Sequence, residues 1–153
     1  MSDAAGLDPE DWALWSSVTA MRAGIDRALE QRLQRDAGLS LADFEILHGL
    51  ASAEGHRLRA GALADALGWE KSRISHQVRR MAERGLLDRQ TCATDGRGTW
   101  VALAAAGADA FAAASCGYAE VLRAAFFHRL APADKRALAR VADVVRHEHA
   151  LHA

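Results

Sequence analysis

The fold of this 153-residue chain is decided by residues 63–103, which read LADALGWEKSRISHQVRRMAERGLLDRQTCATDGRGTWVAL. Gly68 ends a short apolar helix, and a basic helix with apolar positions at helical spacing follows over about residues 70–84. Residues 86–91 and 99–103 alternate like strands and flank a glycine-containing loop, so we expect a hairpin. A short helix, a basic helix and a hairpin in this order are typical of a winged helix-turn-helix, in which the hairpin is the wing.

Positive charge is concentrated in this segment. Residues 71–100 contain seven Lys and Arg against three Asp and Glu, a net charge of +4, whereas the whole chain carries −1. A small basic face on a nearly neutral body suits selective binding to DNA better than indiscriminate coating of nucleic acid. The charge distribution therefore indicates one local contact surface for DNA.

A long helix is predicted before this segment. Asp8-Pro9-Glu10-Asp11 combines a capping Asp with a first-turn proline and acidic residues at the positive end of the helix dipole. An apolar stripe at spacings of three and four then runs to about residue 35, and Gly38 closes the helix. The stripe comprises Trp12, Trp15, Val18, Met21, Ile25, Leu29 and Leu33. A helix of about 27 residues spans roughly 40 Å, so we expect part of the stripe to pack on another chain.

The remaining elements are also mostly helical. Ser40 and Asp43 resemble a capping pair that opens a helix over residues 41–51. A turn at 54–56, a short strand at 57–59 and a brief helix at 61–67 follow. After the hairpin, a helix is predicted from 104 to about 129, and a last helix runs over 135–152, with Pro132 in a first helical turn.

The expected architecture is mainly α, a winged helix-turn-helix with a two-stranded β-wing and long N- and C-terminal dimerisation helices. Residues 39–107 are predicted to form the DNA-binding region. Residues 8–38 and 108–153 are predicted to form the helical dimerisation region.

The order and spacing of several short motifs resemble the MarR family of transcriptional regulators over nearly the whole chain. The matching motifs are Leu39-Ser40 with Leu47 and Leu50, Leu63-Ala64 with Leu67, Ser72 and Ser75 with Val78, Gly85-Leu86-Leu87 with Arg89, Asp95-x-Arg97, and Leu103-x-x-x-Gly107. Two positions depart from the family pattern. Gly96 replaces a second basic residue in the wing, and Ala104 replaces a threonine that would cap the following helix.

The resemblance implies a homodimer that pairs through its first and last helices and places two basic helices on a near-palindromic operator of double-stranded DNA. It also implies a repressor that a small-molecule effector releases. Trp15, Arg22 and His48 are candidates to line an effector pocket, although core packing and surface pairing also explain them.

Eight residues are predicted to contact DNA: Ser72, Arg73, Ser75, His76, Gln77, Arg80, Asp95 and Arg97. The two serines are assigned to phosphates, and Arg73, His76 and Gln77 to base edges in the major groove. Arg97 at the glycine-flanked tip is expected to enter the minor groove. Asp95 either orients the Arg97 guanidinium or only shapes the turn. Trp69 and Trp100 are expected to pack the motif rather than stack on bases.

Three alternatives remain open at this level. A metal-responsive regulator of the same fold would use His147, His149 and His152, and an oxidant-responsive one would use Cys92 or Cys116. A winged-helix module that only joins proteins would need no exposed arginine at the wing.

Other classes receive no support from the sequence. Residues 1–7 have neither a basic flank nor a long apolar run, so no signal peptide or membrane anchor is indicated and a cytoplasmic protein is expected. No nucleophile–base pair, carboxylate dyad or phosphate-binding glycine loop stands out. We therefore expect no enzymatic activity, no cofactor and no membrane partner.

Overall fold

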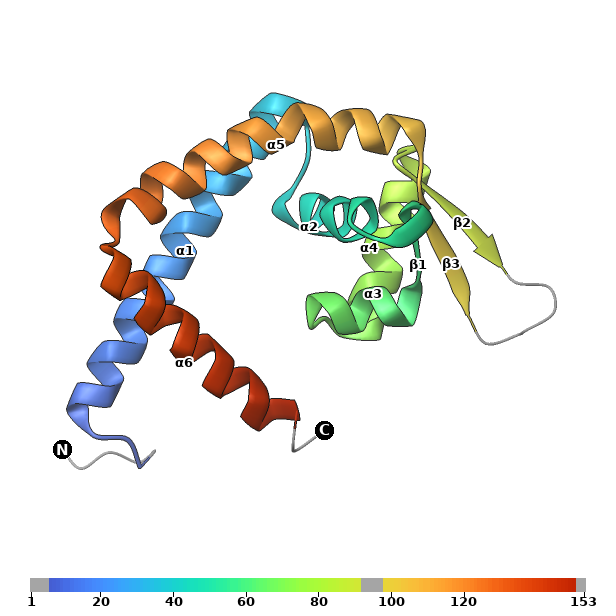
Figure 1. Ribbon diagram of the computed structural model, residues 1–153. Coiled ribbons are helices and arrows are strands. Elements are labelled where there is room, and N and C mark those ends of the chain that lie inside the picture. The colour runs from blue at the N-terminus through green and yellow to red at the C-terminus, as the bar shows by residue number, and fades with distance from the viewer. Residues whose placement is uncertain (1–5, 92–97, 151–153) are drawn as a thin grey trace.

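The computed structural model describes residues 6–91 and 98–150, although of Thr91 and of residues 147–150 only the backbone is described. In chain order the elements are α1 (Pro9–Ala37), α2 (Leu41–Ala51), a 3₁₀ turn (Glu54–His56), β1 (Arg57–Arg59), α3 (Ala60–Leu67), α4 (Lys71–Glu83), β2 (Leu87–Thr91), β3 (Thr99–Leu103), α5 (Ala105–Ala125), a second 3₁₀ turn (Phe127–Arg129) and α6 (Pro132–Ala150). Figure 1 shows α1 and α5 side by side, with α2, α3, α4 and the sheet at one end of the molecule. The mainly helical architecture predicted from the sequence is confirmed.

Side-chain caps fix the starts of α1 and α2. The Asp8 side chain accepts a hydrogen bond from the Asp11 backbone at 2.8 Å, so Asp8 is the predicted cap of α1. Ser40 and Asp43 form the reciprocal capping box of α2. Ala104 precedes α5 without a side-chain cap, as its departure from the family pattern predicted.

The predicted two-stranded wing is confirmed as β2 and β3, and β1 adds a third strand to the same sheet. The order is β1-β3-β2, and both pairs are antiparallel. Leu58 stands opposite buried Val101, which turns this leucine toward the core and places Arg57 and Arg59 on the other face of the sheet. The short strand was predicted, but its pairing with β3 was not, because three residues carry no signal for their partner.

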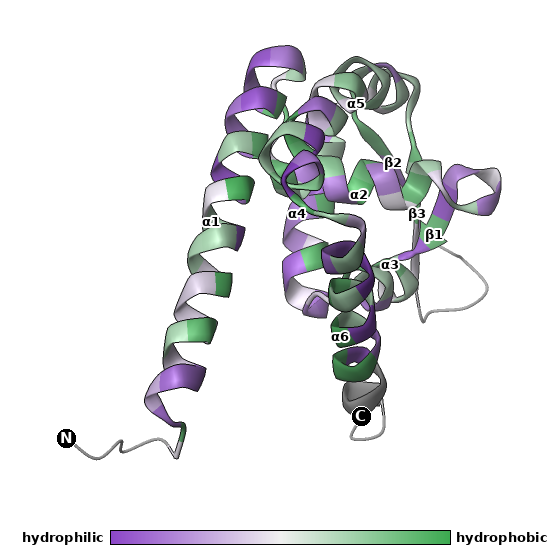
Figure 2. Cartoon of the chain, turned by 60° about the vertical axis from the view of Figure 1, so that its left-hand side comes forward, coloured by the Kyte–Doolittle hydropathy of each residue, from purple (hydrophilic) through white to green (hydrophobic). Residues whose placement is uncertain are grey.

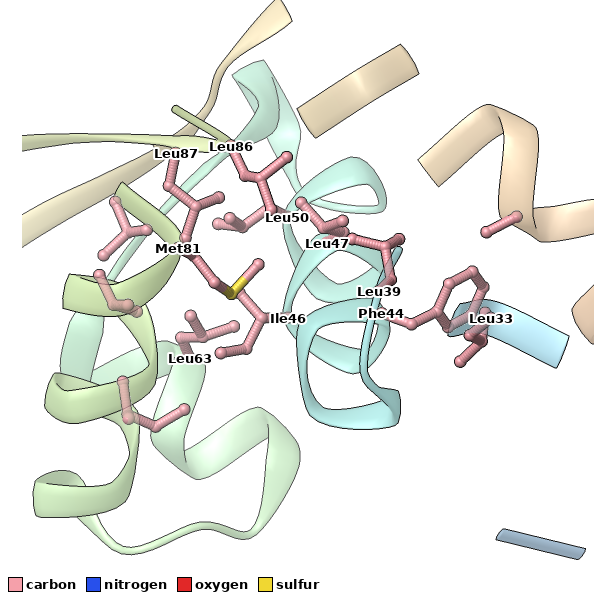
Figure 3. Close-up of a cluster of buried hydrophobic side chains, with 14 of the residues drawn as sticks. Leu33, Leu39, Phe44, Ile46, Leu47, Leu50, Leu63, Met81, Leu86 and Leu87 are labelled. Carbon is pink, nitrogen blue, oxygen red and sulfur yellow. The ribbon is translucent and has the colours of Figure 1, made fainter. Parts of the chain in front are cut away.

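The core surrounds α2, which packs against α3, α4, α5 and the sheet. Met81 from α4, Ile46 from α2 and Leu63 from α3 point toward one another at its centre (Figure 3). The predicted inward residues of α2 and α4 are all buried: Phe44, Leu47, Leu50, Ile74, Val78 and Met81. This packing fixes which face of α4 remains outside.

Helix α1 is buried at only one end. Leu33 is 0% exposed and packs in the core, whereas Trp15 near the other end is 62% exposed. Apolar residues recur along the outer parts of both α1 and α6 (Figure 2). The predicted stripe is thus covered at its C-terminal end and open at its N-terminal end.

The two C-terminal helices differ from their predicted bounds. Helix α5 ends at Ala125 rather than near residue 129, because Phe126 has non-helical backbone angles (φ −129°, ψ −68°) and packs edge-to-face with Phe127. Helix α6 starts at Pro132, which confirms this proline in the first helical turn, although the helix itself was predicted only from residue 135. The Asp134 carboxylate accepts a hydrogen bond from the Ala131 backbone at 2.9 Å.

Gly107 marks the place where α5 passes closest to the winged-helix body. A Cβ atom at this position would lie 2.1 Å from the backbone oxygen of Leu86. That oxygen also accepts a hydrogen bond from the Ala104 backbone at 3.2 Å. The glycine of the Leu103-x-x-x-Gly107 motif therefore permits a close backbone contact.

Within the described ranges, none of the helices combines the length and apolar character that crossing a bilayer requires.

Candidate nucleic-acid interface

Helix α4 presents a polar face to solvent because its opposite face is anchored in the core. Ile74, Val78 and Met81 are buried. Five of the predicted contact residues lie exposed on the other side: Ser72, Arg73, Ser75, His76 and Arg80. The Ser75 hydroxyl donates to the Lys71 carbonyl oxygen at 2.9 Å, so this side chain lies along the first turn. The structure thus brings these five residues together on one helix.

Arg73 is held in place by a neighbouring ring. Its guanidinium carbon lies 3.6 Å from the centroid of the Trp69 ring, a cation–π stack. Trp69 itself is half-buried and packs against the core, as predicted. Stacking limits the conformations that Arg73 samples, so less side-chain entropy is lost when it binds a partner.

Gln77 does not point freely outward as helical spacing predicted. It is half-buried, and its amide nitrogen Nε2 donates to Oδ1 of Asp43 at 2.7 Å. Sequence reasoning assigned Asp43 only to the cap of α2. The contact was missed because 34 residues separate the two side chains.

Asp43 connects α2 with both α4 and the α1–α2 corner. Its carboxylate is 2% exposed and accepts from the Ser40 backbone and from Arg84 Nη1, the latter at 2.7 Å. Arg84 also donates from Nη2 to the Gly38 carbonyl oxygen at 2.9 Å. Burial would raise the pKa of Asp43, but the hydrogen bonds from Ser40 and Arg84 hold it below its usual value. Arg84, counted above in the local positive charge, is therefore engaged within the protein.

The wing strands are described, but the wing tip is not. Asp95 and Arg97, and with them Cys92, lie outside the described residues. On the outer face of the sheet, the guanidinium carbons of Arg57 and Arg59 lie 5.1 Å and 5.0 Å from the Trp100 ring centroid. Trp100 is half-buried under these arginines. Strand alternation at 57–59 was the sequence signal that could have placed both arginines on one face.

A pocket of about 520 Å³ lies between α1, α2, the end of α3 and the start of α4, and we call it the interhelical pocket. Its lining residues are Arg22, Asp26, Glu30, Ser40, Leu41, Ala42, Glu45, His48, Ala66, Leu67, Trp69 and Arg73. Arg22 and His48 come together here as suggested, whereas Trp15 lines a second hollow on α1, which Arg22 also lines. Burial raises the pKa of Glu45, opposed by the positive charges of Arg22 and Arg73.

The residues suggested for metal or oxidant sensing remain untested. The side chains of His147 and His149 are not described, and His152 lies outside the described residues. No group of three His, Cys, Asp or Glu residues suited to a metal occurs in the described part of the chain. The Cys116 thiol is exposed, with Sγ 3.7 Å from Oε1 of Glu120.

The core-anchored helix with its exposed basic face, next to a sheet that extends toward a wing, defines a winged helix-turn-helix protein. The family model described as MarR family matches residues 37–98. AbsC, a MarR family transcriptional regulator from Streptomyces coelicolor, is 31% identical, with a TM-score of 0.86 and coverage of 96% of this chain and 98% of that one. The chain therefore belongs to the MarR family of transcriptional regulators.

Two further solved structures are similar to the chain. Sco3205, a MarR family transcriptional regulator from Streptomyces coelicolor solved in complex with DNA, is 29% identical with a TM-score of 0.86, covering 95% of this chain and 91% of that one. The organohalide-sensing regulator RdhR-CbdbA1625, solved with 2,4-dichlorophenol, is 22% identical with a TM-score of 0.82, covering 97% and 86%, and it shares the fold. A search of curated proteins found no match.

Proposed function

We propose that the chain is a sequence-specific, DNA-binding transcriptional repressor that acts as a homodimer and has no enzymatic activity. The observation that carries the proposal is the exposed face of α4, where Arg73, His76 and Arg80 stand on a helix whose other side is locked in the core. A helix of this kind fits the major groove of B-DNA. The DNA complex of Sco3205 supports the same use of the fold here. A protein that binds operator DNA in this way would work in the cytoplasm.

The contacts divide between positioning and reading. Ser72, Ser75 and Arg80 would hold phosphates, while Arg73 and His76 reach base edges. Gln77 would read bases under the constraint imposed by Asp43. Arg97 would enter the minor groove beside the recognition helix, with Asp95 at its base, as the sequence predicts.

Dimerisation would use the apolar surface that one chain leaves open. Trp15 of α1 and Val141 of α6 are 62% and 59% exposed, and Trp12, Leu14, Val18, Met21, Leu138, Val144 and Val145 are also exposed. Apolar surface on this scale commonly marks an interface. We assign residues 8–38 and 108–153 to dimerisation and residues 39–107 to DNA binding, so that two copies of α4 meet a near-palindromic operator.

The interhelical pocket is the candidate effector site. Arg73 lines it and also stands on the exposed face of α4, so a ligand in the pocket would compete with DNA for the same side chain. Arg22 and His48 in the lining suit a small anionic aromatic compound. Such a ligand would lower DNA affinity and release the repressor.

Binding is tested by fluorescence anisotropy with duplexes from beside the gene and with a duplex of unrelated sequence. We expect tight, salt-dependent binding to one adjacent duplex and weaker binding to the unrelated one. Arg73→Ala should weaken binding, whereas Arg35→Ala, which removes an exposed arginine at the end of α1, should not. Absence of binding to any duplex at low salt would refute the proposal.

A further inference from the structure

The hydrogen bond to Asp43 fixes the orientation of the Gln77 amide. An ionised carboxylate only accepts hydrogen bonds, so the Gln77 atom at 2.7 Å from Asp43 Oδ1 must be the nitrogen Nε2. The carbonyl oxygen Oε1 therefore lies at the other end of the planar amide group. Among the described residues, no buried side-chain oxygen or nitrogen lacks a hydrogen-bond partner. Because Gln77 is half-buried and its bond to Asp43 does not use Oε1, we take Oε1 as the atom through which this side chain meets a partner.

The carboxylate that holds this amide is itself immobilised. The Ser40 backbone donates to Oδ2 at 3.0 Å, and Arg84 Nη1 donates to the same atom at 2.7 Å. Both oxygens of Asp43 are thereby committed, and the hydrogen bonds that hold its pKa low keep it an acceptor throughout the neutral range. The Asp43 network, meaning Ser40, Asp43, Gln77 and Arg84, thus sets the direction of one side chain on α4.

We propose that Asp43 is a specificity-determining positioning residue, which holds the Gln77 amide by one hydrogen of Nε2 so that the oxygen Oε1 is turned toward the operator. A free glutamine pairs with adenine by donating to N7 and accepting from N6. With Oε1 fixed as the outward acceptor, Gln77 selects bases that carry a major-groove amino group, which are adenine through N6 and cytosine through N4. The second hydrogen of Nε2 stays free to donate, for example to N7 of adenine. Guanine and thymine present acceptors there, which repel Oε1, and are disfavoured. This inference rests on the proposed DNA binding.

An isosteric variant reverses the direction of the amide. In Asp43→Asn, the oxygen must remain toward Ser40 and Arg84, because both groups donate. The new Nδ2 then faces Gln77, whose amide turns so that Oε1 accepts from it. Nε2 now points outward, and the preferred base changes to guanine or thymine. In the double variant Asp43→Asn with Gln77→Glu, a carboxylate oxygen points outward again and the original preference returns.

The experiment selects duplexes from a random-sequence library with the full-length wild-type protein and with each variant. The position that Gln77 reads is the one at which Gln77→Ala loses its preference in each half-site. At this position we expect adenine or cytosine for wild type, guanine or thymine for Asp43→Asn, and the wild-type base for the double variant. Asp109→Asn, a matched change of an exposed carboxylate, should select like wild type.

Base analogues provide a test that needs no variant protein. Removing only the exocyclic amino group of the base that faces Gln77 should weaken wild-type binding about fivefold or more, the scale of one hydrogen bond. This arm decides the question even if Asp43→Asn melts at a much lower temperature than wild type.

The outcomes separate the two proposals. If the wild-type protein selects no sequence, the proposed function fails. If it does select a sequence, any one of three results refutes the role of Asp43 while DNA binding stands. These are that Gln77→Ala keeps every preference, that the selected base is guanine or thymine, or that folded Asp43→Asn keeps the wild-type base.

Discussion

Replacing Gly107 by alanine should destabilise the fold although alanine is the better helix former. The new Cβ would lie 2.1 Å from the backbone oxygen of Leu86 and 3.1 Å from Cδ1 of Leu103. Leu86 cannot yield easily, because it is buried and its oxygen accepts the hydrogen bond from Ala104. Overpacking of this kind costs about 1–3 kcal/mol or more, whereas Gly to Ala in a helix gains up to about 1 kcal/mol. Because the clash is with a backbone atom, we take the upper end of this cost, about 3 kcal/mol, and expect a net loss of about 2 kcal/mol.

In a protein of this size such a loss lowers the melting temperature by about 4–8 °C. The assay is thermal unfolding followed by circular dichroism at one fixed protein concentration, because a dimer melts in a concentration-dependent way. Gly61→Ala in α3 is the matched control, since a Cβ there meets no atom within 4 Å. That variant should melt at or slightly above the wild-type temperature. If Gly107→Ala melts no lower than the control, the argument from close packing is refuted.

Three other predictions follow from the site and the open surfaces. Val141→Asp should shift the protein from dimer to monomer, measured by light scattering after size exclusion. An unchanged molecular mass would show that α6 does not form part of the dimer interface. Arg97→Ala should weaken binding to all DNA sequences alike, whereas Arg73→Ala should reduce base preference at one position per half-site by about 1–3 kcal/mol. If both variants lose the same affinity for every sequence in competition assays, the two arginines do not have these separate roles. The pKa of Asp43 is lowered in the folded state, so its ionised carboxylate stabilises the fold above the usual pKa near 3.8, and this contribution is lost as the pH falls through the folded-state pKa. The difference in unfolding free energy between wild type and Asp43→Asn should therefore narrow at acidic pH in urea unfolding. A difference that stays constant with pH would contradict this.

The helix boundaries were predictable where a local chemical signal sets them. Asp8, Ser40 and Asp43 cap helices through side chains three residues from the backbone groups they bind. Gly38 and Gly68 end helices in the left-handed conformation. Such signals act within one turn, so they can be read from sequence alone. The end of α5 carries no such signal, because Phe126 leaves the helix where neighbouring rings pack, and its position was predicted wrongly.

The candidate site was predictable in its residues but not in its connections. Apolar spacing correctly placed Ile74, Val78 and Met81 inside, and with them the exposed face of α4. The bond between Gln77 and Asp43 depends on how α2 packs against α4, which spacing within one helix cannot show. Asp95 and Arg97 lie outside the described residues, so their roles remain predictions.

One consequence follows from α1 being continuous from Pro9 to Ala37. The segment that carries the exposed rings and the segment embedded in the core form a single rigid rod, with no hinge to absorb misalignment. Inserting one residue between Met21 and Leu29 would turn the two ends by about 100° relative to each other and lengthen the rod by about 1.5 Å. In the proposed dimer, the distance between the two copies of α4 would thus be set by the length of α1. Bending of α1 would not adapt the protein to an operator with a different spacing between its half-sites.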